Sequence, residues 1–191
     1  MNNSYIRSII FCILLTWSYS VFSDTSNEKL LATVKSFYGW VLTNGHTASE
    51  LEPKIVNIPG STRFFLDTTS LQAFSDKLMS SNMFSQDFSN AVKRYYKKYE
   101  NDFNRLSKND FDEYESEGGR ILMEVQDMDI YFCAQEYDYT PDFVKGQRIV
   151  NYKINGNHAT AVIESPFKWK TTFNFKQVNG NWLISGYCVF K

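Results

Sequence analysis

Two Asn-Gly pairs near the end of the chain constrain its fold more than any other feature of the sequence. Asn155-Gly156 and Asn179-Gly180 each stand between two segments in which apolar and polar residues alternate. This arrangement is typical of a tight turn between two antiparallel strands. The predicted strands cover residues 148–154, 159–163, 168–177 and 182–190. We therefore expect an antiparallel meander in the last third of the chain.

The third predicted strand separates its side chains into two unlike faces. Trp169, Thr171, Phe173 and Phe175 share one face, and Lys168, Lys170, Thr172, Asn174 and Lys176 share the other. Because successive side chains of a strand point to opposite sides, this pattern predicts a sheet with one apolar face and one face in water.

A long helix is expected ahead of these strands. Apolar residues recur at spacings of three and four over residues 30–42, which predicts an apolar stripe along one side of a helix. Thr25 and Glu28 have the spacing of a capping box at its start. Asn44-Gly45 has the pattern of a helix end. The sequence therefore predicts a first helix from about residue 25 to residue 43.

Two further helices complete the prediction. One begins near residue 70, with Leu71, Phe74 and Leu78 on one side, and the next runs from Ser85 to about Leu106. Residues 46–69 and 107–119 have the composition of irregular segments. Helices followed by a run of strands predict the α+β class, with helices packed on a curved antiparallel sheet.

The first 23 residues have the pattern of a cleavable secretory signal. Arg7 precedes an apolar run over residues 9–17, and small residues follow up to Ser23. The run is shorter than the roughly 20 apolar residues that span a bilayer. We predict a signal peptide over 1–23, one α+β domain over 24–191, and a periplasmic or secreted location. Cleavage after Ser20 and an uncleaved signal-anchor are the alternatives.

Composition narrows the choice of partners. The chain has a net charge of −1, with 43% hydrophobic and 17% aromatic residues. A nearly neutral balance indicates neither nucleic acid nor an anionic membrane surface as a partner. No transmembrane segment is expected in the mature chain. The aromatic residues are enough to fill a core, and they are also common at binding surfaces.

Two cysteines remain once the predicted leader is removed. In an oxidising compartment, Cys133 and Cys188 are expected to form a disulfide. The alternative is a catalytic cysteine with His158 as its base.

Three short motifs resemble a known family. They are Phe37-Tyr38-Gly39-Trp40, the stretch over residues 128–138 with the sequence MDIYFCAQEYD, and Asn181-Trp182-Leu183-Ile184. Together they resemble a family of small exported bacterial proteins of unknown function, which includes enterobacterial envelope lipoproteins. This chain differs from the lipoprotein members because it lacks a lipid-attachment cysteine at the cleavage point.

The resemblance implies a fold and a cellular location, and it supplies no catalytic residues. Such domains resemble the cystatin-like cone of the nuclear-transport-factor-like superfamily, in which a curved sheet cups the helices. Some small periplasmic proteins of similar build are immunity proteins against secreted cell-wall amidases. The resemblance therefore implies a periplasmic protein that could act as an immunity protein.

The chain offers little catalytic machinery. Its two histidines, His46 and His158, stand in no recognisable catalytic or zinc-binding motif, and we expect no cofactor and no metal. Acid–base candidates are Asp127, Asp129, Glu136 and Asp138. The carboxylate of Asp129 could act as a base if aromatic side chains shielded it from water. Aspartates are also common in turns and caps, and Asp127 and Asp129 could have that role instead.

Binding without chemistry is the leading interpretation. The expected partner surface contains Asp129, Tyr131, Glu136, Tyr137, Asp138, Tyr139 and Asp142. Tyrosines beside acidic residues would suit a basic protein, although the same tyrosines could instead seal the edge of the core. We therefore predict a non-catalytic exported protein that binds or inhibits another envelope protein, as immunity proteins do.

A small-molecule site is the main alternative. The mouth of a cone fold could hold a small apolar ligand between the first helix and the sheet. Its lining would be Phe37, Trp40, Val41 and Phe173. An Asp-based enzyme is the third interpretation.

Overall fold

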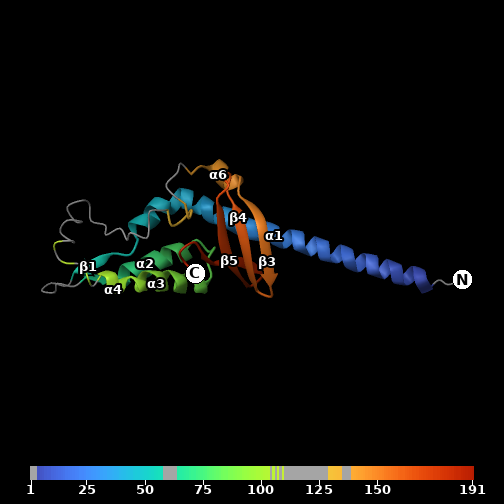
Figure 1. The fold of residues 1–191 in the computed structure, drawn as a ribbon, viewed down its shortest axis with the longest axis horizontal. Coiled ribbons are helices and arrows are strands. Elements are labelled where there is room, and N and C mark those ends of the chain that lie inside the picture. Colours follow the sequence, from blue (N-terminus) through green and yellow to red (C-terminus); the bar gives the residue numbers. More distant parts are fainter. Residues whose placement is uncertain are drawn as a thin grey trace.

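The computed structural model describes residues 4–57, 64–103, 105, 107, 109, 129–134 and 139–191, and up to residue 25 it describes the backbone alone. The helices are α1 (Ser4–Glu50), α2 (Thr68–Met79), α3 (Gln86–Lys98), α4 (Glu100–Phe103) and α6 (Pro141–Lys145). The strands are β1 (Ile55–Asn57), β2 (Phe64–Leu66), β3 (Arg148–Asn155), β4 (His158–Glu164), β5 (Lys170–Val178) and β6 (Asn181–Tyr187). Helices packed on an antiparallel sheet confirm the predicted α+β class (Figure 1).

The four C-terminal strands form the predicted meander, in the order β3-β4-β5-β6. Asn179 and Gly180 have φ angles of 50° and 81°, and two positive values are what a type I′ hairpin turn requires. In the other hairpin Asn155 pairs with His158, so Gly156, with φ 60°, is the first central residue of the turn. Both Asn-Gly signals therefore mark true hairpins.

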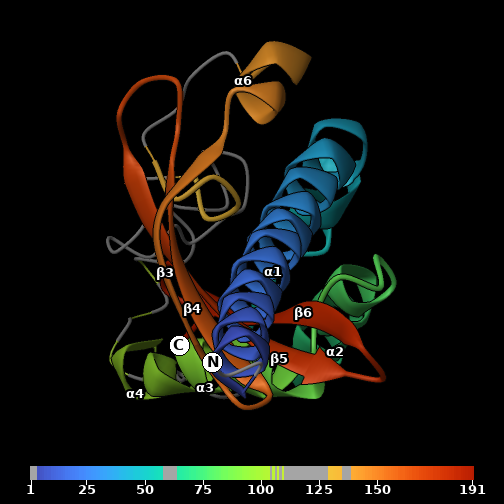
Figure 2. The same cartoon turned by 90° about the vertical axis from the view of Figure 1, so that its right-hand side faces the viewer.

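The apolar stripe of α1 lies against the sheet. Leu30, Val34 and Phe37 are fully buried, and so are Phe173 and Phe175 on β5. Figure 2 shows the sheet bending around one side of α1, and Figure 1 shows α2 and α3 below the C-terminal half of α1. Burying each such side chain stabilises the fold by about 1.5–3 kcal/mol. The predicted division of β5 into a buried and a wet face is confirmed, since its lysines stay at least partly exposed.

Both predicted ends of the first helix were wrong. The helix runs without a break from Ser4 to Glu50, so Thr25 lies inside it. The apolar residues 9–17 belong to the same helix as the predicted stripe. At the other end Asn44 donates its side-chain amide to the carbonyl of Trp40, and Ala48 is fully buried. Packing of this last part against the core outweighs the local stop signal.

The second and third helices match the prediction in place, with altered ends. Asp67 caps α2, since its Oδ1 accepts a hydrogen bond from the Thr69 amide at 2.9 Å. Ser85 occupies the predicted N-cap position of α3, but its hydroxyl makes no capping bond. The third helix ends at Lys98, earlier than predicted, and the short α4 follows Tyr99.

Segment 83–85 covers one edge of the sheet. The Ile184 amide donates to the Met83 carbonyl at 2.8 Å, and the Ser85 amide donates to the Ile184 carbonyl at 2.9 Å. The chain entering α3 therefore lies along β6. At the opposite edge, β3 has no neighbouring strand on its outer side among the described residues.

One pair of strands was not predicted. β1 and β2 pair antiparallel, with Ile55 opposite Leu66. Each has three residues, which is too short for an alternating pattern to stand out from the prolines around it. Phe64 and Leu66 are buried, so this short strand contributes to the core. The predicted loop over 107–119 lies almost entirely outside the described residues.

Candidate functional site

A disulfide joins the turn over residues 129–134 to the end of the last strand. Cys133 and Cys188 are bonded, with their Cα atoms 5.5 Å apart and a separation of 55 positions in the sequence. This confirms the predicted pairing. The bond fixes the start of the predicted partner surface to the sheet, so that segment has a rigid base.

Asp129 organises this turn. Its Oδ1 accepts hydrogen bonds from the amides of Tyr131 and Phe132, at 2.7 and 2.9 Å. Its own amide donates to the Ala134 carbonyl at 2.7 Å, and its carbonyl accepts from the Cys133 amide at 2.8 Å. These contacts are those of a turn-capping residue, which was the alternative to a catalytic base.

The tyrosines nearest to Asp129 are mostly in the core. Tyr131 is buried, so its side chain is not on the surface where the partner prediction placed it. Tyr187 donates its hydroxyl to the Ile130 carbonyl at 3.1 Å. Burial raises the pKa of Tyr38 and of Tyr187 well above the usual value, and desolvation with nearby Asp129 raises the pKa of Tyr139 to about 12. At neutral pH these phenols stay protonated.

The remaining predicted partner residues have different positions. Tyr139 is half-buried, and Asp142 is exposed on α6, where its Oδ1 lies 3.2 Å from the Lys145 Nζ. Glu136, Tyr137 and Asp138 lie outside the described residues, as does Asp127. Among the described residues, the predicted surface therefore keeps Asp142 as an exposed member, with Asp129 and Tyr139 partly exposed.

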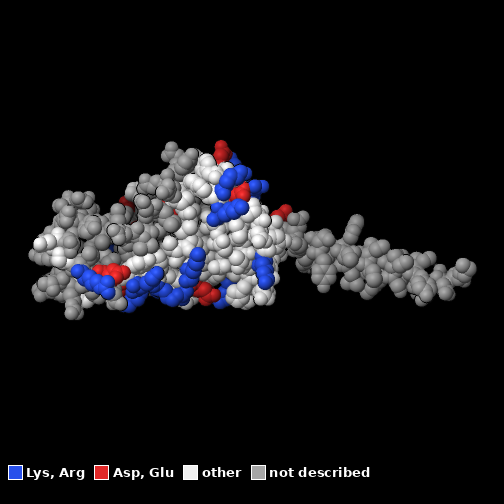
Figure 3. Space-filling view, viewed as in Figure 1, with Lys and Arg blue, Asp and Glu red and all other residues white. Residues whose placement is uncertain are grey.

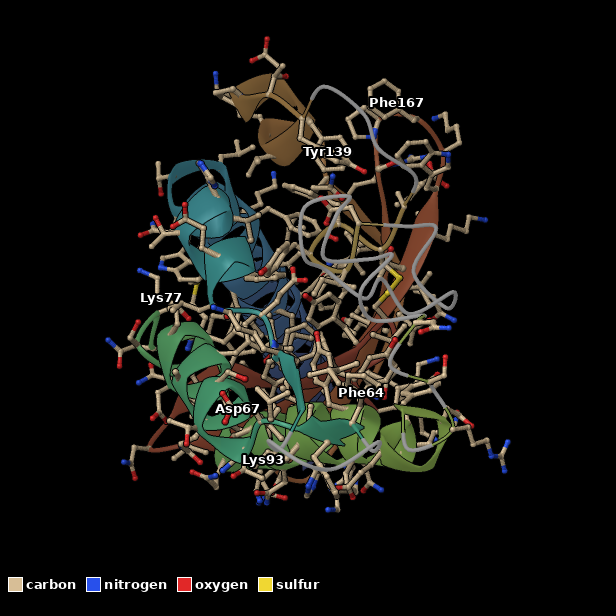
Figure 4. The ribbon with its side chains drawn as sticks, turned by 90° about the vertical axis from the view of Figure 1, so that its left-hand side faces the viewer. Phe64, Asp67, Lys77, Lys93, Tyr139 and Phe167 are labelled. Carbon is tan, nitrogen blue, oxygen red and sulfur yellow. A yellow bond between two sulfur atoms is a disulfide. The ribbon has the colours of Figure 1, made fainter. Side chains whose placement is uncertain are left out.

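A column of aromatic rings leads from Tyr139 to the surface. The Tyr139 ring stacks on Phe132, with centroids 3.8 Å apart and planes at 20°. It also meets the Phe143 ring edge-on at 5.0 Å. Phe143 lies 5.8 Å from Phe167, which in turn lies 5.3 Å from Trp169. Phe167 is 40% exposed, so the column ends in an accessible ring. Figure 4 shows Tyr139 and Phe167 at the same end of the molecule, beside α6.

The turn that carries Phe167 is held closely. The Ser165 amide donates to the Trp169 carbonyl at 2.8 Å, and the Lys168 amide donates to the Ser165 carbonyl at 2.9 Å. On its other side the turn touches α6: a Cβ added to Gly146 would lie 2.5 Å from the Pro166 Cγ. Only glycine permits this close approach, so the exposed ring has firm backbone support.

Three cations surround one buried carboxylate next to this turn. Arg148 donates to Glu164 Oε1 through Nε at 3.1 Å and also through Nη2. The Lys168 Nζ lies 3.5 Å from Oε1, and the Lys170 Nζ lies 4.0 Å from Oε2. The hydrogen bond with Arg148 is the main reason why the pKa of Glu164 is lowered below its ordinary value. Figure 3 shows Lys and Arg side chains gathered at this end of the sheet.

The predicted site residues did not include Phe167, Trp169 or the cations around Glu164. Their signal is the stretch from Glu164 to Lys170, where aromatic and basic residues alternate after a proline at a strand connection. We name the accessible end of the column, with its charged surroundings, the aromatic–cationic surface. It consists of Tyr139, Asp142, Lys145, Arg148, Phe167, Lys168, Trp169 and Lys170.

The predicted pocket residues are part of the packed core. Phe37, Val41 and Phe173 are buried, and Phe37 and Phe173 each meet the Tyr187 ring, at 5.2 and 5.0 Å. Trp40 is partly buried, with the Lys77 Nζ 5.9 Å from its ring centroid. These ring contacts give the small-ligand interpretation no specific support.

The two histidines lie apart from this surface. Both side chains are exposed; His46 is on α1, 3.8 Å from Glu50, and His158 starts β4. Within the described ranges, no three His, Cys, Asp or Glu side chains come close enough to hold a metal ion. The same part of the chain contains no helix with the length and apolar character needed to cross a bilayer.

Comparisons of the chain with protein families, with curated proteins and with solved structures find no match. The architecture itself defines an α+β protein that has an aromatic–cationic surface and a disulfide between the 129–134 turn and the end of the sheet. The family resemblance and the cystatin-like cone stay predictions from the sequence motifs.

Proposed function

We propose that this protein is exported to the periplasm, has no catalytic activity of its own, and binds another protein of the cell envelope. In this proposal it acts as an inhibitor or immunity-type factor. The leader-like N-terminus and the Cys133–Cys188 disulfide support export, because disulfides persist in oxidising compartments.

The observation that carries the proposal is the aromatic column that ends in Phe167. Binding energy at protein interfaces is concentrated in a few aromatic and arginine side chains held in a fixed position and ringed by polar groups. Phe167 is accessible, is backed by Phe143 and Trp169, and stands beside Lys168. A rigid anchor of this kind loses little conformational freedom when it binds.

The contacts of the acid–base candidate favour binding over catalysis. The Oδ1 of Asp129 is engaged by two backbone amides of its own turn. The neighbouring phenols have raised pKa values, so they do not act as bases at neutral pH.

Site-specific photo-crosslinking in the native envelope tests the proposal. A benzophenone amino acid replaces Phe167, and crosslinked products are identified by mass spectrometry. Val178 is the matched control, because it is 38% exposed and lies at the far end of β5. We expect a defined protein adduct from position 167 and none from position 178. Equal labelling from both positions, or no protein adduct at 167 in any growth condition, would refute the proposal.

A second experiment tests export directly. We expect the protein recovered from periplasmic extract to begin near Asp24, as measured by intact mass. Recovery of this protein from the cytosol with residues 1–23 still attached would contradict the predicted periplasmic location.

A further inference from the structure

We infer that the aromatic–cationic surface recognises an acidic protein surface, one that presents carboxylates beside an apolar recess for Phe167. This inference rests on the proposed function and adds the chemistry of the partner. It differs from the sequence argument, which favoured a basic partner for residues 129–142.

The first step is the excess of positive charge. Arg148, Lys168 and Lys170 share the single carboxylate of Glu164, so two positive charges are left over. The fourth cation, Lys145, is balanced by Asp142. Among the described residues the surface around Phe167 is therefore positive.

The second step is that the cations are held and yet accessible. Glu164 is buried, with its side chain 8% exposed, while the side chains of Arg148, Lys168 and Lys170 are 60%, 74% and 60% exposed. The buried carboxylate of Glu164 holds these side chains in position and leaves most of their donor groups facing water. An incoming carboxylate can bind them without first breaking the contacts to Glu164.

The third step is that the two described carboxylates of the predicted partner surface each have a partner within the chain. Asp129 accepts backbone hydrogen bonds, and Asp142 pairs with Lys145. These two carboxylates therefore do not attract a basic partner more strongly than the cations attract an acidic partner.

The pattern favours a protein over a lipid surface. Membrane-binding surfaces combine cations with a large apolar area that enters the headgroup region. Here Phe167 is 40% exposed, and Trp169 is partly buried beneath it. Asp142 adds a negative charge to the rim, and mixed charges suit a partner with charges at defined places.

Nuclear magnetic resonance titration with defined peptides tests the inference. The first probe is a capped pentapeptide with two glutamates on each side of a phenylalanine. The second has glutamine in place of glutamate, and the third has lysine. We expect the glutamate peptide to shift the Trp169 indole signal and the amide signals of 164, 165 and 167–170, and to bind at least about fivefold more tightly than the glutamine peptide.

Charge variants give the matched comparison. Lys168→Gln with Lys170→Gln removes two charges without new repulsion, and Lys168→Glu with Lys170→Glu reverses them. Lys98→Glu with Lys153→Glu makes the same reversal at exposed positions on α3 and β3. We expect the reversal at 168 and 170 to weaken glutamate-peptide binding by about tenfold or more, the neutral pair to weaken it less, and the control to leave it within about twofold. Amide spectra verify that each variant is folded.

Several results would overturn the inference. Equal binding of the glutamine peptide, or tighter binding of the lysine peptide, would refute a carboxylate-selective surface. Sedimentation with phosphatidylglycerol vesicles but not with phosphatidylcholine vesicles, with all peptides inert, would assign the surface to lipid. If crosslinking at position 167 captures a protein while no peptide binds and the charge variants capture it equally, the inference fails and the proposed function stands.

Discussion

Arg148 and Glu164 are direct partners across the β3–β4 pair, and the Arg148 Nε donates to Glu164 Oε1 at 3.1 Å. The two residues close the end of the sheet nearest α6. Because Glu164 is buried and also faces Lys168 and Lys170, its charge holds three cations in place. The charge state of this carboxylate therefore affects both the stability of that end and the arrangement of the surface above it.

Acid should weaken the fold through Glu164. A carboxyl whose pKa is lower in the folded protein than its ordinary 4.5 contributes stability above about pH 4.5 and loses it as the pH falls through the folded value. We expect the urea midpoint to fall below pH 4.5, and Glu164→Gln to be less stable at pH 7 with a flatter acid profile. Glu28→Gln, at an exposed position, is the control. Identical acid profiles for wild type and Glu164→Gln would contradict this prediction.

The disulfide should contribute a large part of the stability. For cysteines 55 residues apart, the loop-closure model gives about 4 kcal/mol. We expect Cys133→Ser with Cys188→Ser to lower the free energy of unfolding by about that amount, measured by urea denaturation. Dithiothreitol should destabilise the wild type and leave the double variant unchanged. Two thiols that react with iodoacetamide in folded mature protein would show that the bond is absent.

Alkaline pH should destabilise the protein through its buried phenols. The pKa of Tyr139 is raised to about 12, against an ordinary value of 10.0. A raised pKa means that this stability is present below pH 10 and is lost as the pH rises toward about 12. We expect the urea midpoint to fall in this range, and less steeply in Tyr139→Phe. Ionisation of Tyr139 at pH 10 in the folded protein, measured at 295 nm as the difference from Tyr139→Phe, would contradict the prediction.

A hydroxyl pair joins α2 to α3. The Oγ atoms of Ser75 and Ser89 lie 2.8 Å apart, and both side chains are buried. Ser75→Ala leaves the Ser89 hydroxyl without this partner, which should cost about 1–3 kcal/mol. Removing both hydroxyls should cost less than the sum of the two single changes. Strict additivity in a double-mutant cycle would show that the pair is not coupled.

The sequence predicts those elements whose pattern is local and long. Apolar residues repeat several times in the stripe over residues 30–42 and in the alternation of β5. Each of the two Asn-Gly pairs stands between two such alternating segments. The end of α1 could not be predicted, because burial of Ala48 overrides the Asn44-Gly45 signal. The strands β1 and β2 are too short to carry a period.

The surface was harder to predict than the fold. Sequence placed Tyr131 on a partner surface, but the turn capped by Asp129 directs it into the core. Phe167 looks like an ordinary residue of a strand connection until its contact with Phe143 is known. These two residues are 24 positions apart in sequence, and only the packing of α6 on the β4–β5 turn brings them together. Long-range packing of this kind leaves no local pattern.

The covered edge of β6 has a consequence for self-association. The Met83–Ser85 segment already occupies that side at Ile184, so among the described residues β3 is the side along which a strand from another molecule can join the sheet. Two copies that met there would each use the open side that the described strands leave. Edge-to-edge pairing of strands would then stop at a dimer. The sheet could extend into a fibre only if segment 83–85 first left the edge of β6.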